Sequence, residues 1–269
     1  MLMVAVLAGC GGAADQDGGA AVAPRQTGSL TVAPGVIRAA ICPPDRAGLP
    51  LRPDRVESFQ AELLRRLGYK LALRMQPSTL PSCAGAAKAL ADGMLDLVAT
   101  APGDDAAGRS GPLQTEPYLV VQYALVVNAG SPRSRDGLDA LRAGARVGVL
   151  AGTVGAEWAR GRLGRRRVSV AAFPDEQAAT AAFAAGRCDA LILPRASAIR
   201  ATRTVPGVRI DRLLDVGEQA RFLIAAANPA LRVRVDSMLE QIIYDGSYAT
   251  VFHRHFRPTP VPVDFLPPD

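Results

Sequence analysis

The order strand–helix–strand–helix–strand occurs twice along this chain, and this duplication restricts the fold more than any other sequence feature. The first copy spans residues 36–99 and the second spans 146–193. Short apolar runs indicate the strands, and apolar residues three and four positions apart indicate the helices. Two strands joined through a helix run parallel, with a right-handed crossover. Each copy therefore predicts a mainly parallel sheet flanked by helices.

Glycines end the predicted helices at matching places in the two copies. Gly68 and Gly164 follow the first helix of each copy, and Gly93 and Gly186 follow the second. Glycine readily adopts the backbone conformation that ends a helix. Two similar copies predict two similar lobes. The expected strands are 36–41, 70–75, 95–99, 146–150, 168–172 and 189–193, and the expected helices are 56–67, 84–91, 154–163 and 176–185.

Two further apolar segments are suited to join the lobes. Residues 118–127 form a long apolar strand after the first copy, and residues 221–227 form another after the second. A chain that leaves one lobe, builds the other and returns makes a two-strand hinge, and such lobes close on ligands. We expect lobe one to comprise 35–123 and 221–269, and lobe two to comprise 124–220. Ligands in open α/β sheets bind beyond the carboxyl ends of the strands.

The basic charge of the chain does not indicate a nucleic-acid partner. The formal net charge is +6, and the hydrophobic and charged fractions of 49% and 21% are typical of a globular protein. The arginines are spread along the chain, and the densest run, 165–167, lies between a predicted helix and strand. Such a run is usually a solvated surface. We expect a monomer without a nucleic-acid partner.

The first residues resemble a bacterial lipoprotein signal. Residues 1–9 are apolar but too few to span a bilayer. They lead into Leu7-Ala8-Gly9-Cys10, which resembles a lipobox and implies lipidation of Cys10 after cleavage. Residues 1–34 are then a signal and a flexible tether, and the protein is periplasmic and membrane-anchored. No Lys or Arg precedes the apolar run, so a misassigned start codon or a disordered start is the alternative.

The cysteines and histidines do not indicate a metal site or catalysis. Cys10, Cys42, Cys83 and Cys188 lack the spacing of zinc or haem motifs. Cys42 and Cys83 both follow predicted strands and an exported chain could join them, but their spacing does not decide this. The only histidines, 253 and 255, do not share a helix face. GxSxG, phosphate-loop and GxGxxG motifs are absent from the sequence. We expect no enzyme, metal or cofactor.

Six segments along the chain carry a family pattern. They are 59–68 (FQAELLRRLG), 89–96 (ALADGMLD), 116–118 (EPY), 147–153 (VGVLAGT), 185–190 (AGRCDA) and 245–252 (DGSYATVF). In this order they resemble the family 3 extracellular solute-binding proteins, the polar amino-acid class of ABC importers, over about residues 35–257. The resemblance implies a two-lobed periplasmic binding protein type II fold that closes on a small solute and presents it to an ABC permease.

The resemblance implies a ligand site at Thr153, Gly152, Arg109 and Tyr118. Thr153 would cap a helix whose N–H groups attract an anion, and Gly152 would let a ligand approach the backbone. An ordinary helix cap without a ligand is the alternative. In the family an arginine about ten residues before the tyrosine binds the ligand carboxylate, and Arg109 lies nine residues before Tyr118.

Two departures from the family pattern affect the expected solute. Pro194 stands where the family carries the carboxylate for the ligand's amino group. The aromatic residue expected after the first strand is missing, and Asp45 is a candidate in the loop that follows that strand. We therefore expect a small polar, anionic solute rather than a standard α-amino acid. Asp96 and Asp189 begin strands and are expected to be structural.

A second resemblance gives an alternative function. Residues 40–45 (AICPPD), with Leu49-Pro50, and residues 96–102 (DLVATAP) resemble binding-like proteins encoded beside periplasmic quinoprotein dehydrogenases. Such a protein would serve as an accessory of a methanol-type dehydrogenase in methanol oxidation. In that case its partner is the dehydrogenase rather than an ABC permease.

Overall fold

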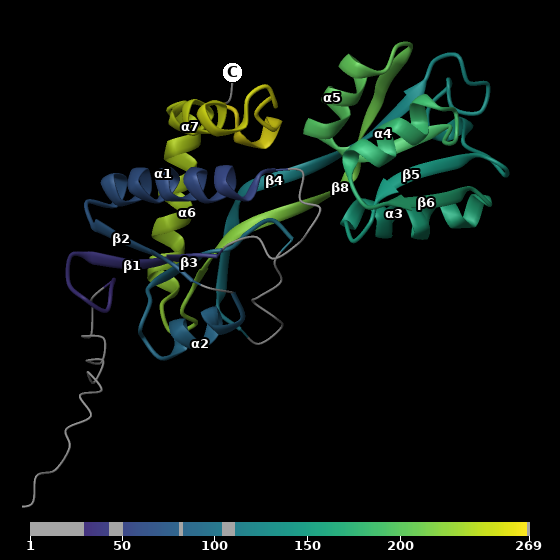
Figure 1. Ribbon diagram of the computed structural model, residues 1–269. Helices are drawn as coiled ribbons and strands as arrows, with labels where there is room; N and C mark the ends of the chain where they lie inside the picture. The colour runs from purple at the N-terminus through teal and green to yellow at the C-terminus, as the bar shows by residue number, and fades with distance from the viewer. Residues whose placement is uncertain (1–29, 43–50, 81–82, 104–110, 268–269) are drawn as a thin grey trace, which may run out of the picture.

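Two α/β bodies joined by two long strands make up the protein (Figure 1). The computed structural model describes residues 30–42, 51–80, 83–103 and 111–267. The strands are β1 (Val36–Ile41), β2 (Arg74–Thr79), β3 (Leu97–Ala99), β4 (Leu113–Asn128), β5 (Arg146–Leu150), β6 (Ser169–Phe173), β7 (Ala190–Pro194) and β8 (Val208–Ile224). The α-helices are α1 (Pro53–Leu71), α2 (Ala86–Ala91), α3 (Val154–Leu163), α4 (Glu176–Ala184), α5 (Arg195–Thr204), α6 (Pro229–Tyr244) and α7 (Ser247–Phe256).

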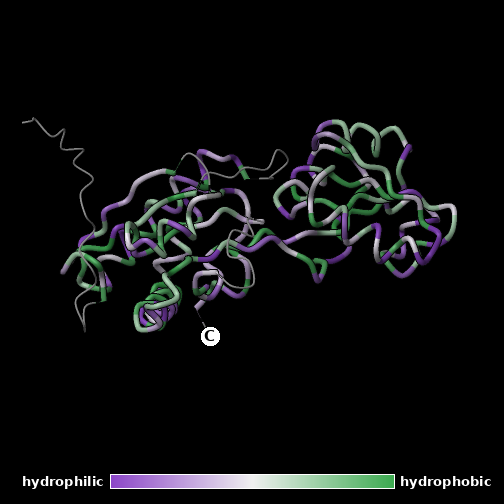
Figure 2. Tube along the Cα trace, turned by 90° about the horizontal axis from the view of Figure 1, so that it is seen from below, coloured by the Kyte–Doolittle hydropathy of each residue, from purple (hydrophilic) through white to green (hydrophobic). Residues whose placement is uncertain are grey.

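The predicted duplication is present as two parallel three-strand units. In the first body β1 pairs in parallel with β2 and β3, and in the second body β5 pairs in parallel with β6 and β7. The strand order β2-β1-β3-β8-β4-β7-β5-β6 is continuous because β4 and β8 pass through both bodies. Figure 2 shows the bodies standing apart, with these crossover strands between them.

The two crossover strands are longer than the sequence indicated. β4 and β8 pair antiparallel from Leu113 opposite Ile224 to Asn128 opposite Val208. Register shifts interrupt the pairing, one of them between Gln122 and Ala124. Such irregularities bend a strand pair and increase its twist. The expected return strand, 221–227, is therefore only the end of β8, and the half of β8 that enters the second body was missed.

The first helix and its following strand also differ from the expected boundaries. Gly68 does not end α1, which continues to Leu71 and closes with Ala72 in the left-handed conformation at φ 53°. Leu71 is buried as part of the helix, so its alternation with Leu73 was wrongly read as the start of a strand. Gly68 instead allows close packing, since a side chain there would lie 3.0 Å from the Leu73 carbonyl oxygen.

The duplicated aspartates hold equivalent strand ends in the two bodies, as expected of structural residues. The Asp96 carboxylate accepts the Arg38 N–H at 2.9 Å, and the Asp189 carboxylate accepts the Arg146 N–H at 2.8 Å. Asp96 also accepts the Val32 N–H at 2.7 Å and is fully buried. Each aspartate thus ties the first strand of its unit to the third.

Apolar residues of helices and strands pack together in both bodies. In the first body Phe59 of α1 meets Tyr248 and Phe256 of α7, at ring distances of 5.8 and 5.0 Å. In the second body Ala124 and Val126 of β4 pack with α4 and α5. Among the described residues, the helices are all too short or too polar to cross a membrane.

A disulfide joins Cys42 and Cys83, which resolves the pairing that the sequence left open. The bond links the residue after β1 to the short helical turn before α2. Both cysteines are buried in a small cluster with Ala40, Leu90 and Val98. Cys188 is a free buried cysteine, and burial raises the pKa of its thiol.

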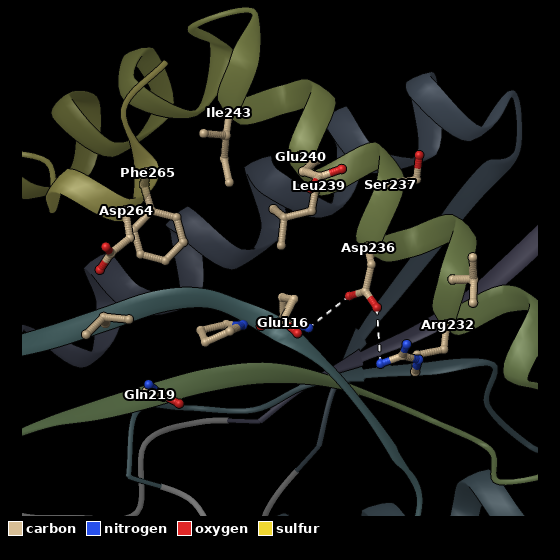
Figure 3. Close-up of a pocket in the computed structure, with 13 residues that line it drawn as sticks. Glu116, Gln219, Arg232, Asp236, Ser237, Leu239, Glu240, Ile243, Asp264 and Phe265 are labelled. Atoms are coloured by element: carbon tan, nitrogen blue, oxygen red, sulfur yellow. Dashed lines mark hydrogen bonds and ion pairs between the residues drawn. The ribbon is translucent and has the colours of Figure 1, made fainter. Parts of the chain in front are cut away.

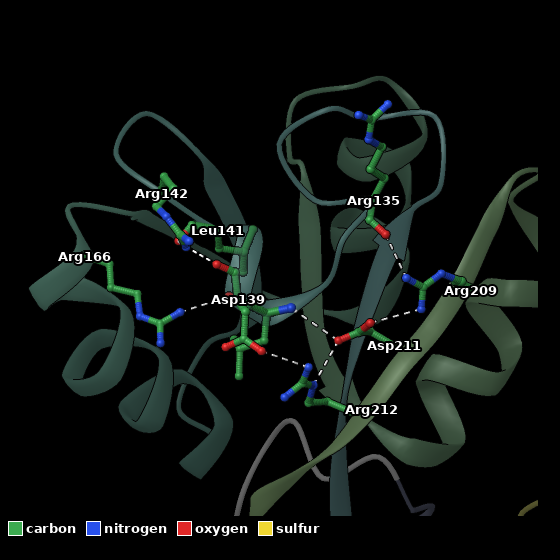
Figure 4. Close-up of polar contacts among 9 residues, drawn as sticks. Arg135, Asp139, Leu141, Arg142, Arg166, Arg209, Asp211 and Arg212 are labelled. Atoms are coloured by element: carbon green, nitrogen blue, oxygen red, sulfur yellow. Dashed lines mark hydrogen bonds and ion pairs between the residues drawn. The ribbon is translucent and has the colours of Figure 1, made fainter.

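A polar network fixes the loop between β4 and β5 to the first half of β8, which lies in the second body (Figure 4). The Asp211 carboxylate accepts the Leu138 N–H at 3.2 Å and ion-pairs with Arg209 and Arg212. Burial alone would raise the pKa of Asp211, but these donors outweigh it and lower the pKa. A side chain at Gly137 would lie 2.4 Å from this carboxylate, so the contact requires glycine.

An ion pair between α1 and the α6–α7 turn gives a test at low pH. Lys70 lies 2.7 Å from Asp245, and the hydrogen bond from Lys70 lowers the Asp245 pKa from 3.8 to about 2. The pair stabilises the fold above pH 3.8, and this contribution is lost as the pH falls through about 2. We expect Lys70→Met to raise the Asp245 pKa toward 3.8, measured by NMR titration.

The loss of stability should be below about 1 kcal/mol, because the pair is partly exposed. Lys88→Met, which removes the exposed pair with Asp92, is the control and should leave the Asp245 pKa unchanged. An unchanged Asp245 pKa in Lys70→Met would contradict the pairing.

Candidate functional site

The carboxyl ends of strands from both bodies converge on one side chain of the crossover, Glu218 of β8. Gly103 follows β3 in the first body, and a side chain there would lie 3.3 Å from Glu218 Oε2. Val154 follows β5 in the second body, and its N–H lies 3.5 Å from Glu218 Oε1. Strand ends are the usual ligand position in α/β sheets. This junction is therefore the candidate site.

Thr153 caps α3 as predicted and forms part of this junction. Its hydroxyl accepts the Ala156 N–H at 3.3 Å and donates to the Leu150 carbonyl oxygen at 2.9 Å. The side chain is buried, with both of these bonds made inside the protein. Gly152 is exposed with φ +73°, and a side chain there would meet no atom within 4 Å. The Gly152 backbone is thus open to a ligand, while the Thr153 hydroxyl positions the helix.

Glu218 was not predicted from the sequence. Its side chain is 4% exposed, and its Oε1 accepts the Tyr123 hydroxyl at 2.9 Å. Among the described residues, no donor contacts Oε2, which is also buried. Burial raises the pKa of Tyr123, and the neighbouring Glu218 charge raises it further, so this hydroxyl stays protonated and donates.

Gly155 in α3 allows Tyr123 to reach Glu218, and its replacement should disturb the junction. A Cβ atom at Gly155 would lie 2.5 Å from two ring carbons of Tyr123. We expect Gly155→Ala to lower the free energy of unfolding by about 1–3 kcal/mol, because the ring must move in a packed region. Denaturant unfolding measures this loss.

The matched control lies on the same helix. A side chain at Gly161 of α3 would meet no atom within 4 Å. Gly161→Ala should therefore leave stability unchanged or increase it by up to about 1 kcal/mol through helix propensity. Equal effects of the two substitutions would show that Tyr123 is not constrained by Gly155.

The other predicted site residues are placed differently. Tyr118 is fully buried, its ring stacks on Phe222 at 4.2 Å, and its hydroxyl donates to the Thr100 carbonyl oxygen. Gln60 Nε2 donates to the same hydroxyl at 2.7 Å. Tyr118 is thus a core residue that packs against Phe222 and the segment after β3. Arg109, Asp45 and Cys10 lie outside the described residues.

A hollow between the bodies, apart from the junction, is lined by arginines. Its volume is about 410 Å³. Arg52 and Arg55 at the start of α1, Arg257 after α7 and Arg200 of α5 all line it. Arg200 is paired with Glu176 and Arg52 with Asp54. Because α5 belongs to the second body and the others to the first, movement of the bodies would change this hollow.

A larger hollow of about 600 Å³ lies behind the crossover, between β4, β8 and α6 (Figure 3). Asp236 of α6 accepts the Glu116 N–H at 2.8 Å and pairs with Arg232 at 3.4 Å. Burial raises the pKa of Asp236. The lining of this hollow comes from the crossover and the first body only, so the second body contributes no helix to it.

The chemical groups near the junction can be compared with those of metal sites and general bases. In the described part of the chain, no group of three or more His, Cys, Asp or Glu side chains could hold a metal ion. His255 is not near Glu218 but pairs with Glu62 of α1 at 2.9 Å. The groups that converge are a carboxylate, a protonated phenol and backbone N–H groups, which suit recognition of a polar molecule.

Structural comparisons identify the fold. The second substrate binding domain of GlnP from Lactococcus lactis, in its open conformation, matches with a TM-score of 0.60 and 13% identity, over 89% of this chain and 99% of that chain. An ancestral cationic amino acid solute binding protein matches at 0.56 and 20%, over 83% and 96%. An ancestral arginine-binding protein bound to arginine matches at 0.50 and 22%, over 82% and 98%.

These likenesses show that the chain has the predicted two-lobed periplasmic binding protein type II fold. No family profile and no curated protein sequence matches the chain. At identities this low the comparisons establish the fold alone.

Proposed function

We propose that this chain is an extracytoplasmic solute-binding protein that captures a small polar solute between its lobes and presents it to an ABC importer. The observation that carries the proposal is the convergence of Gly103 and Val154, from the two bodies, on buried Glu218 of the crossover. A solute held there contacts both lobes and favours the closed arrangement by its extra contacts in that state. The fold supports the same role, since the similar structures are solute-binding domains.

We propose the boundaries of the lobes from the expected hinge. We assign residues 35–123 and 221–269 to lobe one and 124–220 to lobe two, with the change of lobe within β4 and β8. The register shift between Gln122 and Ala124 lies at the first of these boundaries. A break in regular pairing is a suitable position for bending.

The arginine-lined hollow supports the predicted anionic group of the solute. Arg55 and Arg257 are exposed there and are suited to bind a carboxylate in a two-pronged manner. Arg109 remains the family-based candidate for the same task, with Asp45 and Gly152 as further candidate contacts. We further propose a monomer in the periplasm, anchored through a lipid on Cys10.

A ligand screen of the purified protein tests the proposed function. Thermal shift against small carboxylates, amines and alcohols should give at least one compound that raises the melting temperature, because a ligand of the folded state stabilises it. The same compound should reduce the radius of gyration in X-ray scattering as the lobes close. A folded protein that neither binds nor closes with any of these would overturn the proposal.

The dehydrogenase-accessory alternative predicts a different result. Such a protein would co-purify with a periplasmic quinoprotein dehydrogenase and show no thermal shift with small molecules.

Arg109 gives a mutational test of the solute-binding proposal. For a carboxylate that binds the wild-type protein, Arg109→Gln should weaken the affinity about tenfold or more through loss of a charge-assisted pair. Arg203→Gln, on α5, is the matched control for the removed charge.

A further inference from the structure

Helix α3 already has an acidic group of the protein at its N-terminus. Oε1 of Glu218 lies 3.5 Å from the Val154 N–H, where the helix dipole favours negative charge. The Thr153 hydroxyl accepts the Ala156 N–H of the same helix end. A solute carboxylate at this helix end would have to approach a buried carboxylate of like charge.

The second carboxylate oxygen of Glu218, Oε2, requires a hydrogen-bond donor. Among the described residues, no hydrogen-bond donor reaches Oε2, although the side chain is 96% removed from solvent. A buried carboxylate oxygen without a donor is unfavourable, and such groups usually gain a partner in the functional state. Oε1 accepts the Tyr123 hydroxyl and lies near the Val154 N–H of the second body, while Oε2 lies against Gly103 of the first.

We infer that Glu218 determines specificity by accepting a hydrogen bond from a protonated amine or guanidinium of the solute. This rests on the proposed function and defines the solute class: a small molecule that carries a cationic nitrogen. Oε2 lies against Gly103 of the first body and Oε1 lies 3.5 Å from the Val154 N–H of the second, so Glu218 contacts both bodies. Recognition of the cation is then coupled to the hinge.

The inference does not require the solute to lack an acidic group. An acidic group elsewhere on the same molecule remains free to bind arginines between the lobes. The inference excludes a simple acid without a nitrogen donor as the best ligand. Such a molecule would leave Oε2 of Glu218 without a hydrogen-bond donor.

The test measures binding of four probes by calorimetry: putrescine, L-lysine, succinate and 1,4-butanediol. Putrescine and butanediol have similar length and differ in the terminal donors, so the wild-type protein should bind an amine and not the diol. This comparison needs no variant. Glu218→Gln should then weaken amine binding about tenfold or more and leave succinate unchanged or tighter.

Two further variants control for charge and folding. Glu116→Gln removes an exposed carboxylate of the same crossover and should leave amine binding unchanged. Glu218→Asp keeps the charge and should retain more amine affinity than Glu218→Gln.

Amine binding that is equal in wild type and a folded Glu218→Gln would overturn the inference, as would tight binding of succinate without any amine binding. That last result would still support a solute-binding protein. Absence of binding by every polar compound in the wider screen would instead overturn the proposed function.

Discussion

Removal of the Cys42–Cys83 disulfide is expected to lower the free energy of unfolding by about 4 kcal/mol. The two residues are 41 positions apart, and the bond restricts this loop in the unfolded chain. It also joins the end of β1 to the turn before α2, where both cysteines are buried. The double variant Cys42→Ser and Cys83→Ser should therefore melt roughly 10 °C lower than the wild type in calorimetry.

Two measurements separate the bond from the side chains. A reducing agent added to the wild type should produce most of the same decrease in melting temperature. Cys188→Ser is the control, because Cys188 is buried but unbonded, and should have a smaller effect that does not depend on the reducing agent. Equal melting of oxidised and reduced wild type would contradict a stabilising disulfide.

Asp96→Ala is expected to have the next largest effect, a loss of about 3 kcal/mol. The substitution leaves the N–H groups of Val32 and Arg38 without their carboxylate acceptor, and the Arg38 guanidinium loses an ion-pair partner 3.6 Å away. Because Asp96 is fully buried, water does not replace these bonds without opening the start of β3. Urea unfolding measures the loss.

The duplicated residue provides the comparison. Asp189→Ala removes the equivalent bond to the Arg146 N–H, but Asp189 is only partly buried and water can take part of its role. We expect its effect to be about half that of Asp96→Ala or less. A larger loss in Asp189→Ala would contradict the assignment of the stability difference to burial.

The predictions about solute binding depend on the same part of the first body that loss of the disulfide or of Asp96 would weaken. The disulfide and Asp96 both support β1 and β3, whose carboxyl ends lead to the junction at Glu218. Solute binding should therefore be compared only among variants that are fully folded at the assay temperature. Glu116→Gln and Gly161→Ala are suitable reference variants for this comparison, since neither substitution changes a buried contact.

The sequence alone determined the duplication and the order of the elements within each of its two copies. Strands β1 and β5 and helix α3 have the expected boundaries, because apolar spacing and helix ends depend on residues close in the chain. Asp96 and Asp189 were recognised as structural for the same reason, and Thr153 as a helix cap. Each of these features depends on local chemistry that repeats in the two halves.

Only the tertiary structure decided which groups meet at the junction. Glu218 and Tyr123 are 95 positions apart, and the missed part of β8 mixes charged and apolar residues without a clear apolar period. Tyr118 matched a family motif, yet its hydroxyl is buried against Thr100. Whether a polar side chain reaches a cleft or a core depends on where strands far apart in sequence cross, and this is set by long-range packing rather than by any local pattern.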